Sequence, residues 1–150
     1  MYGCILIHTD YYGVIIMKKV FLGLIILAIL TCGMSAGFAD DHLNNTTELN
    51  KAIEQAHVEN KSIMLFFDQK DCHYCNEMKE KTLSNPNVIS KLNEKYITVF
   101  IDVNEQPKIA SKYKVFGTPT VIFLDSNQKE IGKVEGFVDA NEFLNTLKGI

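Results

Sequence analysis

Beyond its N-terminal third, the chain alternates short apolar runs with segments whose apolar residues recur at helical spacing. Apolar runs at 63–67, 96–103 and 118–124 have polar or turn-forming residues on either side, which is typical of buried strands. The third run opens with a proline, which a sheet tolerates at the start of a strand. A fourth run at 129–134 follows the turn-forming segment 125–128, so the last two runs predict an antiparallel hairpin.

Segments with apolar residues three or four positions apart predict helices that bury one face. These helices begin near Thr47, Asn76, Pro86, Pro107 and Asp139. Pro86 suits the first turn of a helix, and Asp139 with Glu142 three residues later is a helix-start signature. The helix from Pro107 is expected to close at Gly117. The predicted order is α-β-α-β-α-β-β-α, with the second helix interrupted before Pro86.

The N-terminal region has the layout of a secretory signal peptide. Met17-Lys18-Lys19 is a short basic segment, residues 20–39 carry no charge, and Gly37 and Ala39 are small residues suited to cleavage before Asp40. We therefore expect a leader over residues 1–39 and a mature domain over residues 40–150. Because the basic segment starts at Met17, we expect translation to start there, which leaves residues 1–16 untranslated.

Two other outcomes stay open for the leader. Left uncleaved, its apolar stretch would anchor the protein, because about 20 apolar residues suffice to span a bilayer. Alternatively, Cys32 would be a lipid-modified N-terminus, although Thr31 is a poor residue directly before such a cysteine. In all three cases the folded domain faces outward, so we expect a periplasmic or other extracytoplasmic location.

The composition of residues 40–150 limits the classes of function that the domain can have. About 110 residues is a common size for a single domain with one core. The whole chain has a net charge of -3, and no basic patch interleaved with aromatic residues is present, so nucleic acid is not an expected partner. Beyond the leader the chain has two cysteines, Cys72 and Cys75, so we expect them to serve chemistry, with no disulfide framework to build.

The segment Cys72-His73-Tyr74-Cys75 lies between a predicted strand and a predicted helix. A thiolate at a helix N-terminus is stabilised by unpaired backbone N–H groups and by the helix dipole, which lowers the thiol pKa. This context favours a redox dithiol. An inert structural disulfide and a metal site are the alternatives. A structural zinc site usually needs four ligands, and after Cys75 there is no further Cys or His.

His57 is a further histidine that a metal site would have to use. It falls near the apolar face of the first predicted helix and has no motif spacing to the cysteines. We therefore expect a partly buried, hydrogen-bonded core histidine at this position and no ligand.

Three motifs in order carry a family resemblance. The cysteine pair is followed by Thr82-Leu83-Ser84-Asn85-Pro86-Asn87-Val88, then by Gly117-Thr118-Pro119-Thr120, and then by Gly136-Phe137-Val138-Asp139-Ala140. Together they resemble the thioredoxin superfamily. More narrowly, they are similar to exported thioredoxin-like proteins and to the periplasmic C-terminal domain of the transmembrane thiol:disulfide interchange protein. The resemblance implies an α/β thioredoxin fold with three α/β/α layers and a mixed central sheet.

The resemblance also implies roles for individual residues. Cys72 would be the exposed nucleophile and Cys75 the buried resolving thiol. Thr118-Pro119 would be a cis peptide beside the pair, with the Thr118 backbone placed to pair with an extended segment of a partner. Tyr74 would join Thr118 and Pro119 in binding the substrate. No cofactor and no metal are implied.

The chain departs from the family pattern around the cysteines. Phe66 stands where thioredoxins commonly have a buried acid, Asp71 stands in place of tryptophan, and Tyr74 in place of proline. Asp68 is a candidate substitute for the missing acid, although an acid at a strand end is more often solvated. An imidazolium at His73 would lower the Cys72 pKa and make the disulfide more oxidising, whereas Asp71 would oppose this. The alternative is that His73 is an exposed spacer.

These observations predict an exported thiol-disulfide oxidoreductase that reduces disulfides in exported proteins and is recharged by a membrane electron-donor protein. The alternatives with the same chemistry are a disulfide oxidase, in which the cysteine pair accepts electrons from the target, and a disulfide isomerase, which rearranges target disulfides. A copper-binding carrier of the same fold would need a distant histidine, which is missing after Cys75. A purely structural binding module would instead keep an inert disulfide.

Overall fold

The computed structural model describes residues 42–150. The expected leader over 1–39, its start at Met17 and the alternative at Cys32 lie outside the described residues. Within the part that is described, no helix is both long enough and apolar enough to cross a membrane.

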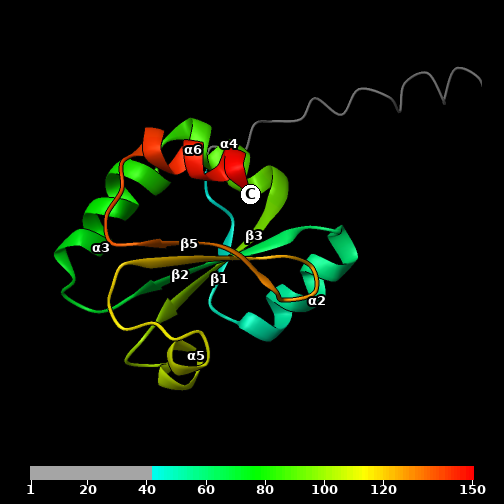
Figure 1. Cartoon of the computed structure of the whole chain (residues 1–150), viewed down its shortest axis with the longest axis horizontal. Helices are drawn as coiled ribbons and strands as arrows, with labels where there is room; N and C mark the ends of the chain where they lie inside the picture. Colours follow the sequence, from blue (N-terminus) through cyan, green and yellow to red (C-terminus); the bar gives the residue numbers. More distant parts are fainter. Residues whose placement is uncertain (1–41) are drawn as a thin grey trace, which may run out of the picture. The chain divides into compact units, whose positions relative to one another are not determined.

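A five-stranded mixed sheet forms the centre of the domain, in the order β1-β3-β2-β4-β5 (Figure 1). The strands are β1 (Asn45–Thr46), β2 (Ser62–Asp68), β3 (Tyr96–Asp102), β4 (Thr120–Leu124) and β5 (Glu130–Glu135). Strand β2 is central, parallel to β3 and antiparallel to β4. The predicted hairpin is confirmed, because β4 and β5 pair antiparallel with an irregularity between Phe123 and Leu124.

Helices cover both faces of this sheet, so the predicted three-layer α/β/α arrangement is confirmed (Figure 1). They are α2 (Leu49–Glu59), α3 (His73–Glu77), η1 (Met78–Leu83), α4 (Pro86–Lys95), α5 (Pro107–Lys112) and α6 (Ala140–Gly149). Helices α3, α4 and α6 lie on one face together with the π-helical η1, and α2 and α5 lie on the other.

The buried residues of β2 alternate between the two faces, because successive side chains of a strand point to opposite sides. Met64 and Phe66 pack in the cluster that contains Cys75, whereas Ile63, Leu65 and Phe67 pack against α2 and α5. All five are essentially inaccessible to solvent. The end of β2, from which the chain runs to the cysteines, is therefore held from both sides.

The predicted helix starts at Pro86 and Asp139 are confirmed with their capping contacts. The Asn85 side chain accepts a hydrogen bond from the Asn87 N–H at 3.0 Å, and Pro86 occupies the first turn of α4. The Asp139 carboxylate accepts from the N–H groups of Asn141 and Glu142 at 2.8 and 3.0 Å. Both caps satisfy donors that a helix leaves unpaired at its start.

Three predictions were wrong: the burial of His57 on α2, the end of α5 and the start of β4. His57 is exposed, because the buried face of α2 is formed by Leu49, Ala52 and Ala56, and the next residue along the helix points elsewhere. Helix α5 ends at Lys112 and does not continue to Gly117. Strand β4 starts at Thr120, so the proline precedes the strand and does not open it.

Candidate active site

The site is built where β2 runs into α3. Strand β2 ends at Asp68, and the chain turns through Asp71, whose φ of 62° lies in the left-handed region. Within the turn, the Cys72 N–H donates to the Gln69 carbonyl at 3.4 Å. Cys72 is the N-cap residue of α3, so its sulfur faces the unpaired N–H groups of the first helical turn.

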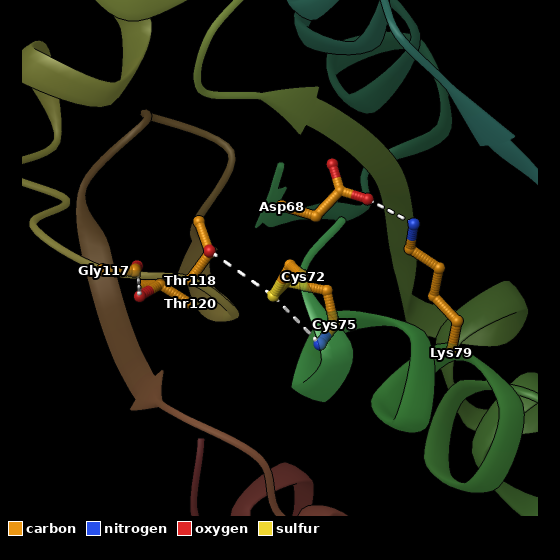
Figure 2. The surroundings of a disulfide bond; sticks show 7 residues. All are labelled: Asp68, Cys72, Cys75, Lys79, Gly117, Thr118 and Thr120. Atoms are coloured by element: carbon orange, nitrogen blue, oxygen red, sulfur yellow. Dashed lines mark hydrogen bonds and ion pairs between the residues drawn. A yellow bond between two sulfur atoms is a disulfide. The ribbon is translucent and has the colours of Figure 1, made fainter. Parts of the chain in front are cut away.

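Cys72 and Cys75 form a disulfide with 5.2 Å between their Cα atoms (Figure 2). Their surroundings differ. Cys75 is completely buried in the cluster with Phe66 and Met78, whereas Cys72 is half-buried. The Cys72 sulfur also accepts a hydrogen bond from the Cys75 N–H at 3.2 Å and one from the Thr118 hydroxyl at 3.5 Å. The less buried of the two cysteines is thus the one whose sulfur has hydrogen-bond donors.

The loop before β4 brings Thr118 and Pro119 to the disulfide. The peptide bond between them is cis, as the family resemblance implies, and Pro119 is buried. The Pro119 carbonyl accepts from the Gly136 N–H at 2.9 Å, and the Thr120 hydroxyl donates to the Gly117 carbonyl at 2.7 Å. Motifs that lie far apart in sequence therefore meet at the cysteines.

The two residues between the cysteines face solvent. Tyr74 is 59% exposed, and the His73 side chain is 85% exposed. Their rings meet edge-on with centroids 5.4 Å apart, and His73 Nε2 lies 4.0 Å from a Glu77 carboxylate oxygen. A hydrogen bond from Lys81 is the main cause that lowers the pKa of Glu77, and His73 contributes less. The carboxylate beside His73 is therefore ionised at neutral pH.

Asp68 does not follow the expectation that a strand-end acid is solvated. Its side chain is 14% exposed and forms an ion pair with Lys79 (Figure 2). The Lys79 ammonium also lies 5.9 Å from the centre of the Phe66 ring. Lys79 is one turn after Cys75 on the same helical segment, so this pair joins the end of β2 to the helix that carries the buried cysteine.

Phe116 is an exposed residue near Thr118 that the sequence reasoning missed. It lies two residues before Thr118 and is 94% exposed. The sequence placed it inside a helix expected to reach Gly117, where an apolar residue needs no special explanation. Because α5 ends at Lys112, Phe116 belongs to the loop that leads to Thr118.

Residues 42–150 contain no cluster of three or more His, Cys, Asp or Glu side chains that could hold a metal ion.

Comparison with known proteins assigns the family. The family model for a thioredoxin-like domain matches residues 49–150. The chain belongs to this thioredoxin-like family. The solution structure of a thioredoxin from Thermus thermophilus superposes with a TM-score of 0.65 at 29% identity, covering 71% of this chain and 85% of that one. The predicted thioredoxin fold is confirmed.

A narrower similarity connects this thioredoxin-like domain with thiol:disulfide interchange proteins. The DsbD protein of Campylobacter jejuni is 34% identical over 112 residues, which cover 72% of this chain and 19% of DsbD. The C-terminal domain of Neisseria meningitidis DsbD in its oxidised form superposes with a TM-score of 0.57 at 28% identity, covering 69% of this chain and 95% of that domain. The chain thus spans about a fifth of the length of the DsbD relative. It is a DsbD-like thiol-disulfide protein with a CxxC disulfide.

Proposed function

We propose that this protein is an exported thiol-disulfide oxidoreductase that reduces disulfides in other exported proteins. The observation that carries the proposal is the difference between the two sulfurs. Cys72 is half-buried and its sulfur accepts two hydrogen bonds, whereas Cys75 is fully buried one helical turn away. This is the arrangement expected of an attacking thiol and a resolving thiol.

The reaction starts from the reduced dithiol. The Cys72 thiolate attacks one sulfur of the target disulfide, forms a mixed disulfide with it and releases the other target sulfur as a thiolate, which takes a proton from solvent. The Cys75 thiol then loses its proton and attacks the Cys72 sulfur. The Cys72–Cys75 disulfide forms, and the second target sulfur leaves as a thiol. Two electrons have passed from the domain to the target.

The hydrogen bonds to Cys72 act on the first step. In the reduced domain, the Cys75 N–H and the Thr118 hydroxyl would both stabilise a negative charge on the Cys72 sulfur and so favour its thiolate form. The thiolate is the reactive form of the nucleophile. Phe66 occupies the place of the usual buried acid, so the proton of Cys75 must leave by another route in this protein.

Each turnover leaves the domain oxidised, so a reductant must restore the dithiol. We propose a membrane electron-donor protein for this step, because the chain resembles a C-terminal part of DsbD and its N-terminal region has the layout of an export signal. The proposed electron acceptors are exported proteins with thiols or disulfides.

Disulfide oxidation is the second candidate direction, and the same contacts favour it. Donors that stabilise the Cys72 thiolate also stabilise the reduced form, which makes the disulfide more oxidising. Equilibration of the domain with glutathione buffers decides between the two. A potential near that of thioredoxin supports the reductase, and one tens of millivolts or more above the glutathione couple supports the oxidase.

The different roles proposed for Cys72 and Cys75 predict different behaviour of their serine variants. Cys72→Ser should abolish reduction of insulin disulfides, because the attacking thiolate is lost. Cys75→Ser should instead accumulate mixed disulfides with target proteins, which are visible on non-reducing gels and identifiable by mass spectrometry. The matched control is the uncleaved full chain with Cys4→Ser and Cys32→Ser, which should keep full activity because both cysteines lie in the expected leader. Faster alkylation of Cys75 than of Cys72 at neutral pH would show the roles to be reversed.

A further inference from the structure

Two exposed aromatic residues belong to the segments that form the site, Tyr74 between the cysteines and Phe116 two residues before Thr118. Among residues 42–150, Tyr74 and Phe116 are the aromatic residues with exposed side chains, and Phe116 has the larger exposed fraction, 94%. Tyr74 lies between the cysteines. Successive Cα atoms are 3.8 Å apart, so the Cα of Phe116 is within about 7.6 Å of that of Thr118, whose hydroxyl contacts the Cys72 sulfur.

The loop that presents Phe116 is anchored on both sides. On the N-terminal side, Lys114 adopts a left-handed φ of 52° and the Val115 N–H donates to the Ala110 carbonyl at 3.0 Å. On the C-terminal side, the Gly117 carbonyl accepts the Thr120 hydroxyl, and a Cβ atom at Gly117 would meet no atom within 4 Å apart from those of its chain neighbours. The loop is thus hydrogen-bonded on both sides of Phe116, and the space at Gly117 is open.

The main chain at Thr118 is available to a partner. Within residues 42–150, neither the N–H nor the carbonyl of Thr118 takes part in a backbone hydrogen bond, whereas the neighbouring Pro119 carbonyl is bonded to Gly136. Free main-chain groups next to a strand are suited to pairing with an extended peptide. The site therefore offers main-chain pairing at Thr118 and an apolar ring two residues away.

We propose that Phe116 is a specificity-determining residue that packs against an apolar side chain next to the target's cysteine. The occupant of this surface is an extended, disulfide-bearing segment of a partner protein with apolar residues beside its cysteine. Exposed aromatic residues at a functional site commonly supply a large part of binding energy. The proposal rests on the proposed function, because it concerns the targets of the same dithiol.

Phe116 takes no part in electron transfer under this proposal. It contributes to the complex that precedes attack by Cys72, so it should affect polypeptide disulfides and leave small hydrophilic disulfides unaffected. The full chain with Cys4→Ser and Cys32→Ser is the suitable background, because Cys72 and Cys75 are then its only thiols.

The test compares two symmetric peptide disulfides, one with leucine and one with serine on both sides of the cysteine, and oxidised glutathione as a small disulfide. Rate constants for reaction with the reduced chain are measured below saturation. We expect the leucine peptide to react about tenfold faster than the serine peptide. Phe116→Ser should bring this ratio close to one and change the glutathione rate less than about twofold. Phe116→Leu should keep most of the ratio.

Val58→Ser is the matched control, because Val58 is 86% exposed but lies on α2, which covers the opposite face of the sheet from α3. It should keep the full preference for the leucine peptide. A ratio near one in the unsubstituted chain, or a ratio that survives Phe116→Ser, overturns the role of Phe116 and leaves the reductase proposal intact. A reduced chain that reacts with none of the three disulfides overturns both proposals.

Discussion

At the residue scale, Cys72 and Cys75 show how burial separates two identical groups that are three positions apart. Cys75 is inaccessible and surrounded by apolar side chains, which disfavours a charge on its sulfur. Cys72 is half-buried at the start of α3 and accepts two hydrogen bonds, which favours a charge there. This difference in surroundings supports the proposed order, in which Cys72 attacks first and Cys75 resolves the mixed disulfide.

The role of His73 stays a prediction. Its side chain is exposed, so a substitution can test its charge without disturbing the core. If an imidazolium at His73 stabilises the Cys72 thiolate, His73→Ala should raise the Cys72 pKa, and a change of one unit corresponds to about 1.4 kcal/mol. The substitution then destabilises the reduced form, so the reduction potential should become more negative. Thiolate absorbance against pH measures the first change, and equilibration with glutathione measures the second.

The exposed His57 on α2 gives the matched control, because His57→Ala removes a histidine remote from the cysteines and should change neither quantity. An unchanged Cys72 pKa in His73→Ala would establish His73 as a spacer. The Cys75 N–H and the Thr118 hydroxyl would then account for the activation of Cys72.

Tyr96 predicts a loss of stability at alkaline pH. Burial raises the pKa of Tyr96 above its ordinary value of about 10. Above pH 10 the unfolded chain therefore loses this proton before the folded chain does, and the free energy of unfolding decreases as the pH rises toward the folded-state pKa. Urea unfolding at pH 8 and at pH values above 10 measures this decrease in the free energy of unfolding. The decrease should be smaller for Tyr96→Phe than for the unsubstituted chain. Tyr74→Phe, at an exposed tyrosine, should show the same decrease as the unsubstituted chain.

At the element scale, the helix after the cysteines changes geometry. Residues 73–77 form a short α-helix and residues 78–83 continue it as a π-helix. The buried Thr82 hydroxyl donates to the Val138 carbonyl at 2.6 Å, which links this segment to the residues before α6. π-helical turns are often found at functional sites, and this one follows directly on the turn that carries Cys75.

The start of α6 allows a quantitative test of helix capping. Asp139→Ala removes the acceptor for two N–H groups at the helix start, so it should lower the free energy of unfolding by about 1 kcal/mol. Urea denaturation measures this change. Glu54→Ala replaces an exposed acid in the middle of α2 and should change stability by less than about 0.5 kcal/mol. Equal effects of the two substitutions would contradict a specific cap at Asp139.

At the scale of the whole molecule, the location of the domain depends on whether the N-terminal region is a leader. If residues 17–39 are a cleaved signal peptide, mass spectrometry of the exported protein should find Asp40, or a residue within a few positions, at the N-terminus. Ala39→Leu should block or shift cleavage, because the site requires a small residue. Recovery of the chain starting at Met17 would contradict cleavage and favour an anchor, and a lipid on Cys32 would establish the third alternative.

Local patterns in the sequence were sufficient for most elements of the domain. The apolar run 63–67, the helix start at Asp139 and the position of the Cys72/Cys75 pair between strand and helix were all predicted correctly. Each depends on interactions within a few residues, such as side-chain alternation, capping and the spacing of two cysteines. The order of the motifs along the chain was enough to predict the fold family as well.

Contacts between distant segments decided the rest. The two-residue strand β1 exists because it pairs with β3, and the ion pair of Asp68 depends on where Lys79 lies on the neighbouring helix. Helix α5 ends early because Lys114 takes a left-handed conformation, which places Phe116 in an exposed loop. Sequence periodicity predicts which side chains share a face, but burial and hydrogen-bond partners are determined only when elements pack together. The sequence therefore identified the cysteine pair, and the tertiary structure placed Thr118 beside it and left Phe116 exposed two residues before Thr118.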